Sequence, residues 1–428
     1  MNVQKRDLPK RQIELSIELT ADEFQPYLMR AAERISKEVK IDGFRPGKVP
    51  YDVLKKKVGE QAISEEASQD AVRKSYVDAV IQEKLDAVGA PDVRVTKLAP
   101  GNPFTYTAVV ALMPDVTLGD ISSMKTKKQE VVVTDVDVAG TIDELRKMRS
   151  TEKLVLRASA KGDKVELDFT ISKNNMPIEG GSGTKYPLVL GEGRFLPDFE
   201  TAILGMSAGE EKMFQLTFPK DYFNQKLRGQ AHVVKLKVLN VYKIQIPEAD
   251  DAFAKTVGDF ANLEALKTAI RDNIKREKET KATEKFDSDL LQELVGKSTF
   301  GEMPDVLVAG ELTKMLEELK TDITSKGMSY ETYLSNLGKT EEDLKKGFEA
   351  PAELRVKTGL AIREVIKADQ LTVTDEELNT ELEKVKRIYA ASEEAAKQIQ
   401  SNSYRNYLAN VLVNRKVVEK LRKAAEVS

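Results

Sequence analysis

The chain has 428 residues, which is too long for one hydrophobic core and suggests about three domains. Its net charge of −3 gives no overall attraction to nucleic acid, and the absence of cysteine excludes disulfides and thiolate chemistry. No apolar run approaches the roughly 18–20 residues that span a bilayer, and the N-terminus lacks an apolar signal region, so we expect a cytoplasmic protein without membrane contact.

The first 112 residues predict an α+β domain. Polar and apolar residues alternate over 12–19, which indicates a half-buried strand. Thr20 and Glu23 have the spacing of a capping box, so a helix is expected to begin there. The remaining expected elements are a helix from Tyr51, a helix over 60–88, and strands over 93–98 and 104–112.

A loop rich in glycine and proline, residues 43–50, lies between the first two helices. Its composition excludes a helix interior or a central strand, and its prolines limit the backbone entropy lost on docking. A loop that exposes Phe44 beside two cations is suited to docking on a partner. Arg45 and Lys48 suit an anionic surface such as RNA phosphate or acidic side chains. Residues 30–57 carry nine Lys/Arg and four Asp/Glu, a local charge of +5. The other interpretation is a plain helix–helix turn whose phenylalanine packs into the core.

The pattern G-F-R-x-G-K-x-P in this loop resembles the ribosome-docking signature of the bacterial trigger factor family. The resemblance implies docking on protein and RNA of the large ribosomal subunit near the exit tunnel. It assigns the contact to six consecutive residues, Gly43, Phe44, Arg45, Pro46, Gly47 and Lys48. The family often carries a third basic residue where this chain has Pro46.

Residues 113–150 are expected to link the first two domains. An apolar run at 131–133 precedes a helix that is expected from Thr134 through Met148. In the resembled family this stretch is an extended connector, which the residues alone do not indicate.

Residues 151–246 predict a twisted antiparallel sheet around one short helix. Phe199 and Ile203 share a face of this helix, which is expected within 195–206 and ends at Gly205. The expected strands are the segments 161–170, 186–191, 213–219 and 231–242.

The same region resembles the FKBP-type peptidyl-prolyl isomerase fold. Its motifs occur in the matching order: Gly162-Asp163, Phe169, 190–193 (L-G-E-G), 195–200 (F-L-P-D-F-E), 205–211 (G-M-S-A-G-E-E), and Phe218-Pro219 with Tyr222. The resemblance implies a pocket with Phe199 as its floor and five wall residues, Phe169, Tyr186, Phe195, Leu196 and Tyr222. Ile178 and Val234 stand where active members usually have phenylalanine, which leaves the rate of the reaction open.

The implied reaction requires no acid, base, metal or cofactor. Rotation about an X–Pro bond meets a barrier of roughly 18–20 kcal/mol because the twisted amide loses its resonance and charge separation. An apolar pocket removes water from the carbonyl, which favours the twisted amide over the dipolar planar one. Tyr222 could also donate a hydrogen bond to the substrate carbonyl. The other interpretation of these aromatic residues is an ordinary small-barrel core.

Residues 247–428 predict an all-α domain. An apolar stripe from Phe260 to Leu294 is interrupted by the charged stretch 275–285, which indicates a long helix that is exposed there. Further helices are expected from Pro304, from Pro351, from the capping box of Thr374 and Glu377, and through 404–421.

Periodicity does not decide whether these helices form a bundle or separate arms. The resembled family uses arms that enclose a cavity for unfolded segments. Soft or amphipathic side chains adapt to varied partners, and four such residues are candidates for binding them: Met303, Met315, Tyr330 and Tyr333. For any single one of the four, the ordinary core position is the favoured interpretation.

Three motifs that suggest other chemistry are incomplete. Residues 338–340 (G-K-T) end like a phosphate loop, but Tyr333 stands at its first glycine, so no ATP is expected. Residues 191–193 lack the third glycine of a dinucleotide motif, because Leu196 stands there. His232 is the one histidine in a chain without cysteine, which gives no basis for a zinc site. We therefore expect neither a cofactor nor a metal.

The sequence thus predicts a multidomain α+β protein with an N-terminal α+β ribosome-docking domain, an FKBP-like antiparallel sheet with one short helix, and an all-α C-terminal domain with helical arms. The predicted function is that of an ATP-independent, partly ribosome-associated chaperone that binds nascent and unfolded polypeptides and isomerises X–Pro bonds. Two alternatives stay open: a freestanding prolyl isomerase, and a chaperone with an inactive isomerase domain. Whether the free protein forms a homodimer is also open.

Overall fold

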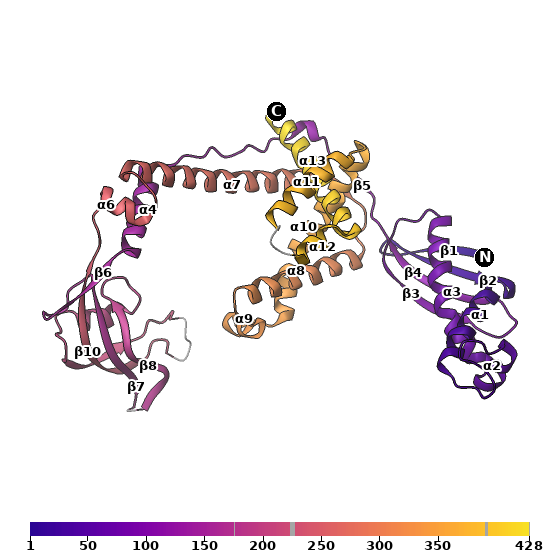
Figure 1. The fold of residues 1–428 in the computed structure, drawn as a ribbon, viewed down its shortest axis with the longest axis horizontal. Coiled ribbons are helices and arrows are strands. Elements are labelled where there is room, and N and C mark those ends of the chain that lie inside the picture. Colours follow the sequence, from indigo (N-terminus) through magenta and orange to yellow (C-terminus); the bar gives the residue numbers. More distant parts are fainter. Residues whose placement is uncertain (175, 223–226, 390–392, 428) are drawn as a thin grey trace. The chain divides into compact units, whose positions relative to one another are not determined.

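The computed structural model describes residues 1–174, 176–222, 227–389 and 393–427. The chain forms two compact units. One combines residues 1–129 with 283–428, and the other comprises residues 130–282. Figure 1 shows the helices and strands of both units, coloured along the sequence. The long helix α7 (Leu263–Lys297), which the interrupted apolar stripe predicts, contributes residues to both.

The N-terminal part of the first unit is an antiparallel sheet with three helices, as the α+β prediction requires. Its strands lie in the order β1-β2-β4-β3 and are β1 (Asn2–Leu8), β2 (Gln12–Leu19), β3 (Ala87–Lys97) and β4 (Phe104–Leu112). Its helices are α1 (Ala21–Glu38), α2 (Tyr51–Val58) and α3 (Glu60–Gln82).

The core of this part lies between the sheet and the helices α1 and α3. Alternate residues of β2, from Ile13 to Leu19, are at most 4% exposed, and α1 adds Phe24. The capping box of Thr20 and Glu23 forms as predicted and starts α1. A polar pair also lies in this core: the hydroxyls of Ser75 and Tyr106 are 2.7 Å apart, and burial raises the pKa of Tyr106 to about 12. Each hydroxyl thereby has the partner that a buried polar group needs.

Two features of this part differ from the prediction. The sequence does not predict β1, because this edge strand is polar and mostly exposed and so lacks a clean alternation. The helix expected to continue to residue 88 ends at Gln82. Lys84 adopts a left-handed φ of 52°, and the amide of Leu85 donates to the carbonyl of Val80 (3.0 Å), which turns the chain toward β3.

The rest of the first unit is helical, as predicted. Its helices are α8 (Asp305–Ser325), α9 (Tyr330–Leu337), α10 (Glu341–Ala368), α11 (Asp375–Ile388), α12 (Glu393–Ile399) and α13 (Asn402–Val427). The short strands β5 (Val116–Thr117) and β11 (Thr299–Phe300) pair with each other. The C-terminal half of α7 packs with α10 and α13 around Leu290, Ala361 and Leu421, all fully buried.

The prediction that a helix begins at Pro351 is wrong. Helix α10 begins at Glu341, where Thr340 and Asp343 form a reciprocal capping box. Pro351 lies inside the helix, where it removes one backbone hydrogen bond without ending the helix.

The second unit contains an antiparallel sheet with one short helix, in agreement with the prediction. The strand order is β6-β10-β7-β8, and β9 also pairs with β10. These elements are β6 (Thr151–Val155), β7 (Asp163–Lys173), β8 (Met176–Val189), α5 (Pro197–Ile203), β9 (Glu211–Thr217) and β10 (Ala231–Gln245). Phe199 and Ile203 of α5 are fully buried in the core of this sheet, as their shared face predicts.

Strand β8 begins at Met176, ten residues before the start expected at Tyr186. Its first half contains glycines, which weaken the sequence signal of a strand. Two of them are required by close packing. A Cβ at Gly181 would lie 2.3 Å from Cγ1 of Ile178, and a Cβ at Gly183 would lie 2.5 Å from Cε1 of Phe169.

A separate core of the second unit joins α4 (Asp135–Met148), α6 (Asp251–Val257) and the N-terminal half of α7. Val138 and Ile142 of α4 pack there with Phe253 and Leu266. The segment expected as a linker over 113–150 therefore contains a helix with its own packing partners.

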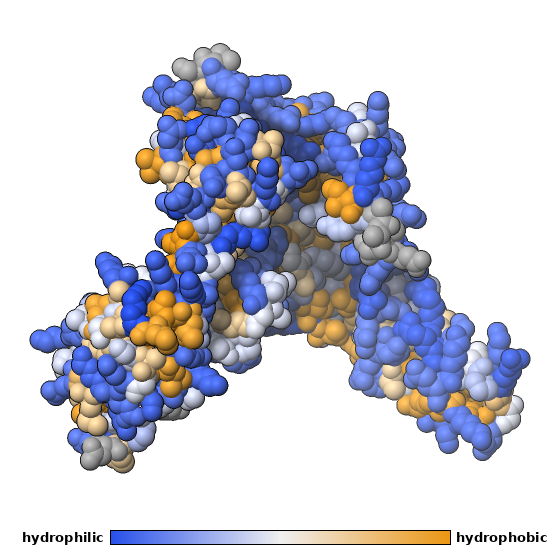
Figure 2. Space-filling model, turned by 60° about the vertical axis from the view of Figure 1, so that its left-hand side comes forward, coloured by the Kyte–Doolittle hydropathy of each residue, from blue (hydrophilic) through white to orange (hydrophobic). Residues whose placement is uncertain are grey.

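Charged and polar side chains cover most of the face drawn in Figure 2, with apolar patches between them. No helix in the described ranges combines the length and the apolar character needed to cross a membrane.

Candidate functional site

A cavity of about 730 Å³ opens in the second unit beside β7, β8 and the start of α5. Five of the six residues predicted for an isomerase pocket line it: Phe169, Tyr186, Phe195, Leu196 and Tyr222. The sixth, Phe199, is fully buried, and its ring stacks on that of Phe195 with 4.5 Å between the ring centroids. The fold thus brings all six predicted residues together. We call this the aromatic cavity.

Phe169 lies at the centre of the aromatic contacts. Its ring meets those of Tyr186, Phe195 and Phe199 edge-on, with ring centroids 5.7, 5.6 and 5.5 Å apart. Such edge-to-face pairs are favourable because the positive edge of one ring meets the negative face of the other. The backbone of Gly183 passes against the Phe169 ring where no Cβ fits, which further limits the ring's movement. The walls of the cavity are therefore held in place by one another.

Glu200 fixes the loop that carries Phe195. Its carboxylate accepts hydrogen bonds from the backbone amides of Gly191 (2.8 Å) and Phe195 (3.3 Å), although the residue itself is buried. The motif containing Glu200 is visible in the sequence, but this positioning role is not, because it depends on where the loop folds back.

Tyr222 completes another side of the cavity. Its ring packs against Phe218 with 4.8 Å between ring centroids, and Phe218 in turn meets the buried ring of His232 edge-on. Burial raises the pKa of Tyr222 above its usual range, so the phenol keeps its proton at neutral pH. A protonated phenol is a hydrogen-bond donor, as the proposed contact with a substrate carbonyl requires.

The sequence prediction missed several residues of the cavity wall. Ile171, Leu216, Phe218 and Leu227 also line it, together with backbone of the glycine-containing part of β8. Ile171 follows Phe169 by two residues on β7, so strand alternation was a usable signal. Of the two positions where active relatives usually have phenylalanine, Ile178 lines the cavity, whereas Val234 is fully buried in the core.

The loop 43–48 lies in the first unit between α1 and α2. Phe44 is 41% exposed, and its neighbours Arg45, Pro46 and Lys48 are also exposed. The amide of Gly47 donates to the carbonyl of Ser36 on α1 (2.9 Å). The amide of Lys48 donates to the carbonyl of Arg45 (3.0 Å). Gly43 and Gly47 have φ of 85° and 79°, which favours glycine.

These contacts make the loop a fixed turn. Neither Arg45 nor Lys48 forms an ion pair within the described part of the chain. The phenylalanine does not pack into the core, so the plain-turn interpretation does not describe this loop.

The four candidate chain-binding residues do not form one cluster. Each is half-buried; Met303 precedes α8, Met315 lies within α8, and Tyr330 and Tyr333 lie on α9. A cavity of about 770 Å³ lies beside the start of α9, and Tyr330 is the only one of the four among its lining residues in the described ranges. The ammonium of Lys320 lies 5.1 Å from the centroid of the Tyr330 ring. No group of three or more His, Asp or Glu in the described ranges is arranged to hold a metal.

Comparisons with known proteins cover almost the whole chain. Residues 1–145 match the family "Bacterial trigger factor protein (TF)", residues 156–246 match "FKBP-type peptidyl-prolyl cis-trans isomerase", and residues 262–423 match "Bacterial trigger factor protein (TF) C-terminus". A solved structure titled "Promiscuous Substrate Recognition in Folding and Assembly Activities of the Trigger Factor Chaperone" aligns over 99% of this chain and 100% of its own, with a TM-score of 0.49 and 23% identity.

Several curated relatives are named trigger factor. That of Caldicellulosiruptor saccharolyticus is 30% identical over 425 residues, 99% of this chain and 96% of the relative. That of Carboxydothermus hydrogenoformans is 33% identical over 420 residues, 98% of each chain. That of Enterococcus faecalis is 34% identical over 379 residues, 88% of each chain. The chain therefore belongs to the bacterial trigger factor family, ribosome-associated chaperones that carry an FKBP-type peptidyl-prolyl cis-trans isomerase domain.

Proposed function

We propose that this chain isomerises X–Pro bonds in the aromatic cavity and docks on the ribosome through the loop 43–48, without using ATP. The observation that carries the catalytic part is the convergence of Phe169, Tyr186, Phe195 and Tyr222 on one cavity above the buried Phe199. This arrangement supplies apolar walls and two phenolic hydroxyls, those of Tyr186 and Tyr222.

The cavity favours the twisted amide over the planar one. A proline ring that enters it leaves water behind, so the planar amide loses the solvation of its dipole. The twisted amide has less charge separation, so it loses less solvation free energy when it enters the cavity. The Tyr222 hydroxyl can donate to the substrate carbonyl, which fixes the orientation of the bond. Each lowering of the barrier by about 1.4 kcal/mol raises the rate about tenfold.

The docking part rests on the exposed Phe44 beside the exposed cations Arg45 and Lys48, on a turn tied to α1. A fixed turn loses little entropy when it binds. Cations on it attract RNA phosphate or acidic protein side chains, and the phenylalanine supplies apolar area.

Independence from ATP is supported by the place of residues 338–340. Gly338 ends α9 in a left-handed conformation, and Thr340 caps α10, so this sequence is a helix–helix turn and not a strand-to-helix phosphate loop. Binding of unfolded chains by Met303, Met315, Tyr330 and Tyr333 stays a prediction, as does location in the cytoplasm. A homodimer of the free protein also stays a prediction, which analytical ultracentrifugation would test.

Catalysis is tested by the isomerisation rate of a short prolyl peptide. We expect Tyr186→Ala and Phe195→Ala each to lower kcat/KM about tenfold, because each opens one wall of the aromatic cavity to water. The control is Tyr242→Ala, which changes an aromatic residue of the same sheet that does not line this cavity. Equal rates for wild type and both wall variants would contradict catalysis at this site.

A further inference from the structure

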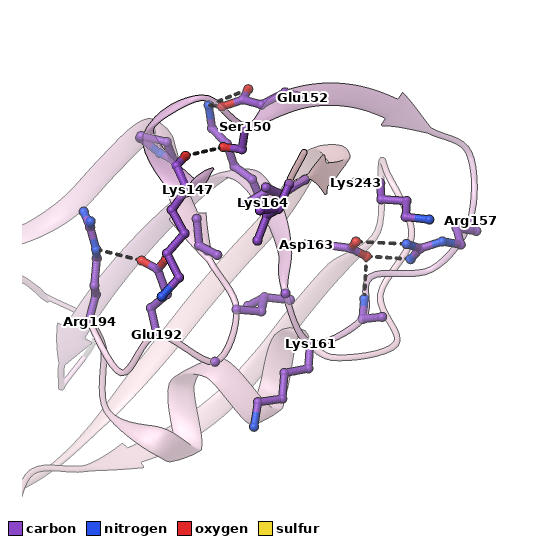
Figure 3. A pocket seen from close by; sticks show the side chains of 18 residues that line it. Lys147, Ser150, Glu152, Arg157, Lys161, Asp163, Lys164, Glu192, Arg194 and Lys243 are labelled. Atoms are coloured by element: carbon purple, nitrogen blue, oxygen red, sulfur yellow. Dashed lines mark hydrogen bonds and ion pairs between the residues drawn. The ribbon is translucent and has the colours of Figure 1, made fainter. Parts of the chain in front are cut away.

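A second cavity in the same domain, of about 740 Å³, has a different chemical character. It lies beside the end of α4, the starts of β6 and β7, and the ends of β8 and β10. One wall is apolar and includes Val189, Leu190 and Ile244. The other side is strongly charged, as Figure 3 shows. We call it the lysine cavity.

The lining of the lysine cavity carries an excess of positive charge. Its six cationic residues are Lys147, Arg157, Lys161, Lys164, Arg194 and Lys243, and its three acidic residues are Glu152, Asp163 and Glu192. The lining therefore has a net charge of +3, in a chain whose net charge is −3. Such a concentration of one sign of charge in a concave site attracts ligands of the opposite sign.

Each acidic residue of the lining already has a cationic partner. Arg157 donates two hydrogen bonds to the Asp163 carboxylate (2.5 and 2.9 Å). The Lys164 ammonium lies 2.8 Å from both carboxylate oxygens of Glu152. Arg194 pairs with Glu192 at 3.2 Å. Figure 3 draws these three pairs as dashed lines. The three remaining lysines therefore have no hydrogen-bonded acidic partner in the lining, although, besides Arg157, Lys243 is near enough to Asp163 to help lower the pKa of that carboxyl.

Those lysines, Lys147, Lys161 and Lys243, come from three separate parts of the domain: the last turn of α4, the loop before β7, and β10. Within the part of the chain that the structure describes, the side chain of none of them forms a salt bridge or a hydrogen bond; Lys147 takes part only through its backbone carbonyl, and the acids of the lining pair with other cations. Lys161 is also positioned by packing. Its side chain lies so close to Gly191 that a Cβ there would be 2.8 Å from Cγ and Cε of the lysine.

The lysine cavity adjoins the aromatic cavity through the loop 191–196. Gly191 and Glu192 line the lysine cavity, Phe195 and Leu196 line the aromatic cavity, and Arg194 lines both. A polypeptide whose proline occupies the aromatic cavity has flanking residues close to this loop. The combination of free ammonium groups with an apolar wall suits an extended segment with acidic side chains better than a small inorganic anion.

We propose that the lysine cavity binds acidic residues of the same polypeptide whose X–Pro bond is in the aromatic cavity, so that the enzyme prefers prolines flanked by Asp or Glu. The inference rests on the proposed catalysis in the aromatic cavity and names a substrate class for it. Charges that lie away from the rotating bond interact equally with the planar and twisted amide. The preference therefore lowers KM and leaves kcat unchanged.

The test uses the full chain and two labelled prolyl peptides with the same X–Pro core. One peptide carries Asp and Glu in both flanks, and the other carries Asn and Gln at the same positions. Peptide binding is measured by fluorescence anisotropy and isomerisation by NMR exchange, at low salt and at high salt. We expect wild type to have a roughly threefold to tenfold higher kcat/KM for the acidic peptide at low salt, because exposed charge pairs are individually weak. We expect this ratio to fall toward one at high salt, because ions screen exposed charges.

The informative variant replaces three side chains, Lys147→Gln, Lys161→Gln and Lys243→Gln. It should reduce the ratio to about one and leave kcat/KM for the neutral peptide unchanged. The matched control is Lys212→Gln, Lys235→Gln and Lys237→Gln, which removes the same charge from β9 and β10 at positions that line neither cavity. This control should keep the wild-type ratio.

Four outcomes would overturn the inference. They are equal binding and rates of both peptides with wild type, an equal loss in the control variant, a loss of neutral-peptide activity in the informative variant, and selective binding of inorganic phosphate with no peptide preference. The last would indicate a small-anion site. Absence of any isomerisation, with preferential binding of the acidic peptide intact, would contradict the proposed catalysis and support the binding inference.

Discussion

At the scale of single residues, the aromatic cavity depends on a few side chains that fix one another. Phe169 contacts three aromatic rings, and Glu200 holds the loop that carries Phe195. Tyr186 and Tyr222 carry the hydroxyls of the cavity wall, and Tyr222 is the residue proposed to donate to the substrate carbonyl. These residues differ in what they contribute, so their substitutions should have separable effects.

Tyr222→Phe removes the phenolic donor and keeps the ring. We expect kcat/KM for a prolyl peptide to fall about fivefold, the value of one ordinary hydrogen bond, with little change in stability. Because burial raises the pKa of Tyr222, we expect wild-type activity to be constant from about pH 6 to 9. Tyr242→Phe is the control. An unchanged rate in Tyr222→Phe would contradict a role for the hydroxyl.

Asp163 gives a prediction about pH. Its carboxylate is 5% exposed and accepts hydrogen bonds from Arg157 and from the amide of Ala160, and the Arg157 contact lowers the pKa of Asp163. A lowered folded-state pKa adds stability above the ordinary value near 4, and this stability is lost as the pH falls through the folded-state pKa. We expect Asp163→Asn to cost about 2 kcal/mol at pH 7.

The loss should begin to shrink below about pH 4, where Asp163 of the unfolded chain becomes protonated, and it should vanish at the lower pH where the folded-state carboxyl is protonated too. Hydrogen exchange of β7 amides across a pH series measures it. The exposed pair of Arg94 and Asp92 gives the control Asp92→Asn, which should change stability by less than about 0.5 kcal/mol. A cost in Asp163→Asn that stays constant from neutral to acidic pH would exclude the ionised carboxylate as its source.

At the scale of elements, the sequence predicts those whose signal is local. The strand β2 alternates along its length, and α1 and α11 begin at capping boxes. The edge strand β1 and the glycine-containing half of β8 are missed, because sheet pairing and close ring packing determine them more than their own residues do.

The aromatic cavity was predicted because its residues lie in recognisable motifs. The lysine cavity was not, since its free lysines are far apart in sequence and each is ordinary by itself.

Helix α10 provides a test at this scale. Pro351 interrupts the hydrogen bonding of a helix that is otherwise continuous from Glu341 to Ala368. We expect Pro351→Ala to raise stability by about 1–3 kcal/mol, because alanine restores the missing donor. Thr340→Ala should lower stability by about 1 kcal/mol through loss of the capping box. Denaturant unfolding, with hydrogen exchange of the α10 amides as the probe, measures the stability change in both variants. A lower stability of Pro351→Ala would show that the proline's bend is required for packing.

At the scale of the whole molecule, the parts of the chain that are linked to different activities have separate hydrophobic cores. The isomerase sheet packs around Leu167, Phe199 and Leu236, whereas α4, α6 and α7 pack around a separate set of residues. The loop 43–48, which is proposed to dock on the ribosome, belongs to the first unit. The division into docking, isomerase and helical chaperone domains is therefore a proposal that the separate cores and matched family segments support.

Because the isomerase sheet has its own core, we expect the isomerase domain to fold and to act without the rest of the chain. A fragment of residues 151–246 should fold by itself and keep kcat/KM for a short prolyl peptide within about twofold of the full chain, since the aromatic cavity is lined from within it. Circular dichroism and the peptide assay check this. An unfolded fragment would indicate that α4 or α7 contributes essential packing.

The central claim is that the chain docks on ribosomes through the loop 43–48. The most direct measurement is co-sedimentation with bacterial ribosomes at low and high salt, comparing wild type with the double variant Phe44→Ala, Arg45→Ala. A matched control replaces two exposed residues of α3, Ile81→Ala and Lys74→Ala. We predict that wild type and control pellet with ribosomes, more at low salt because the contact is partly ionic, and that the double variant stays in the supernatant. Equal pelleting of all three proteins would contradict docking through this loop, and no pelleting of wild type would favour an isomerase that works away from the ribosome.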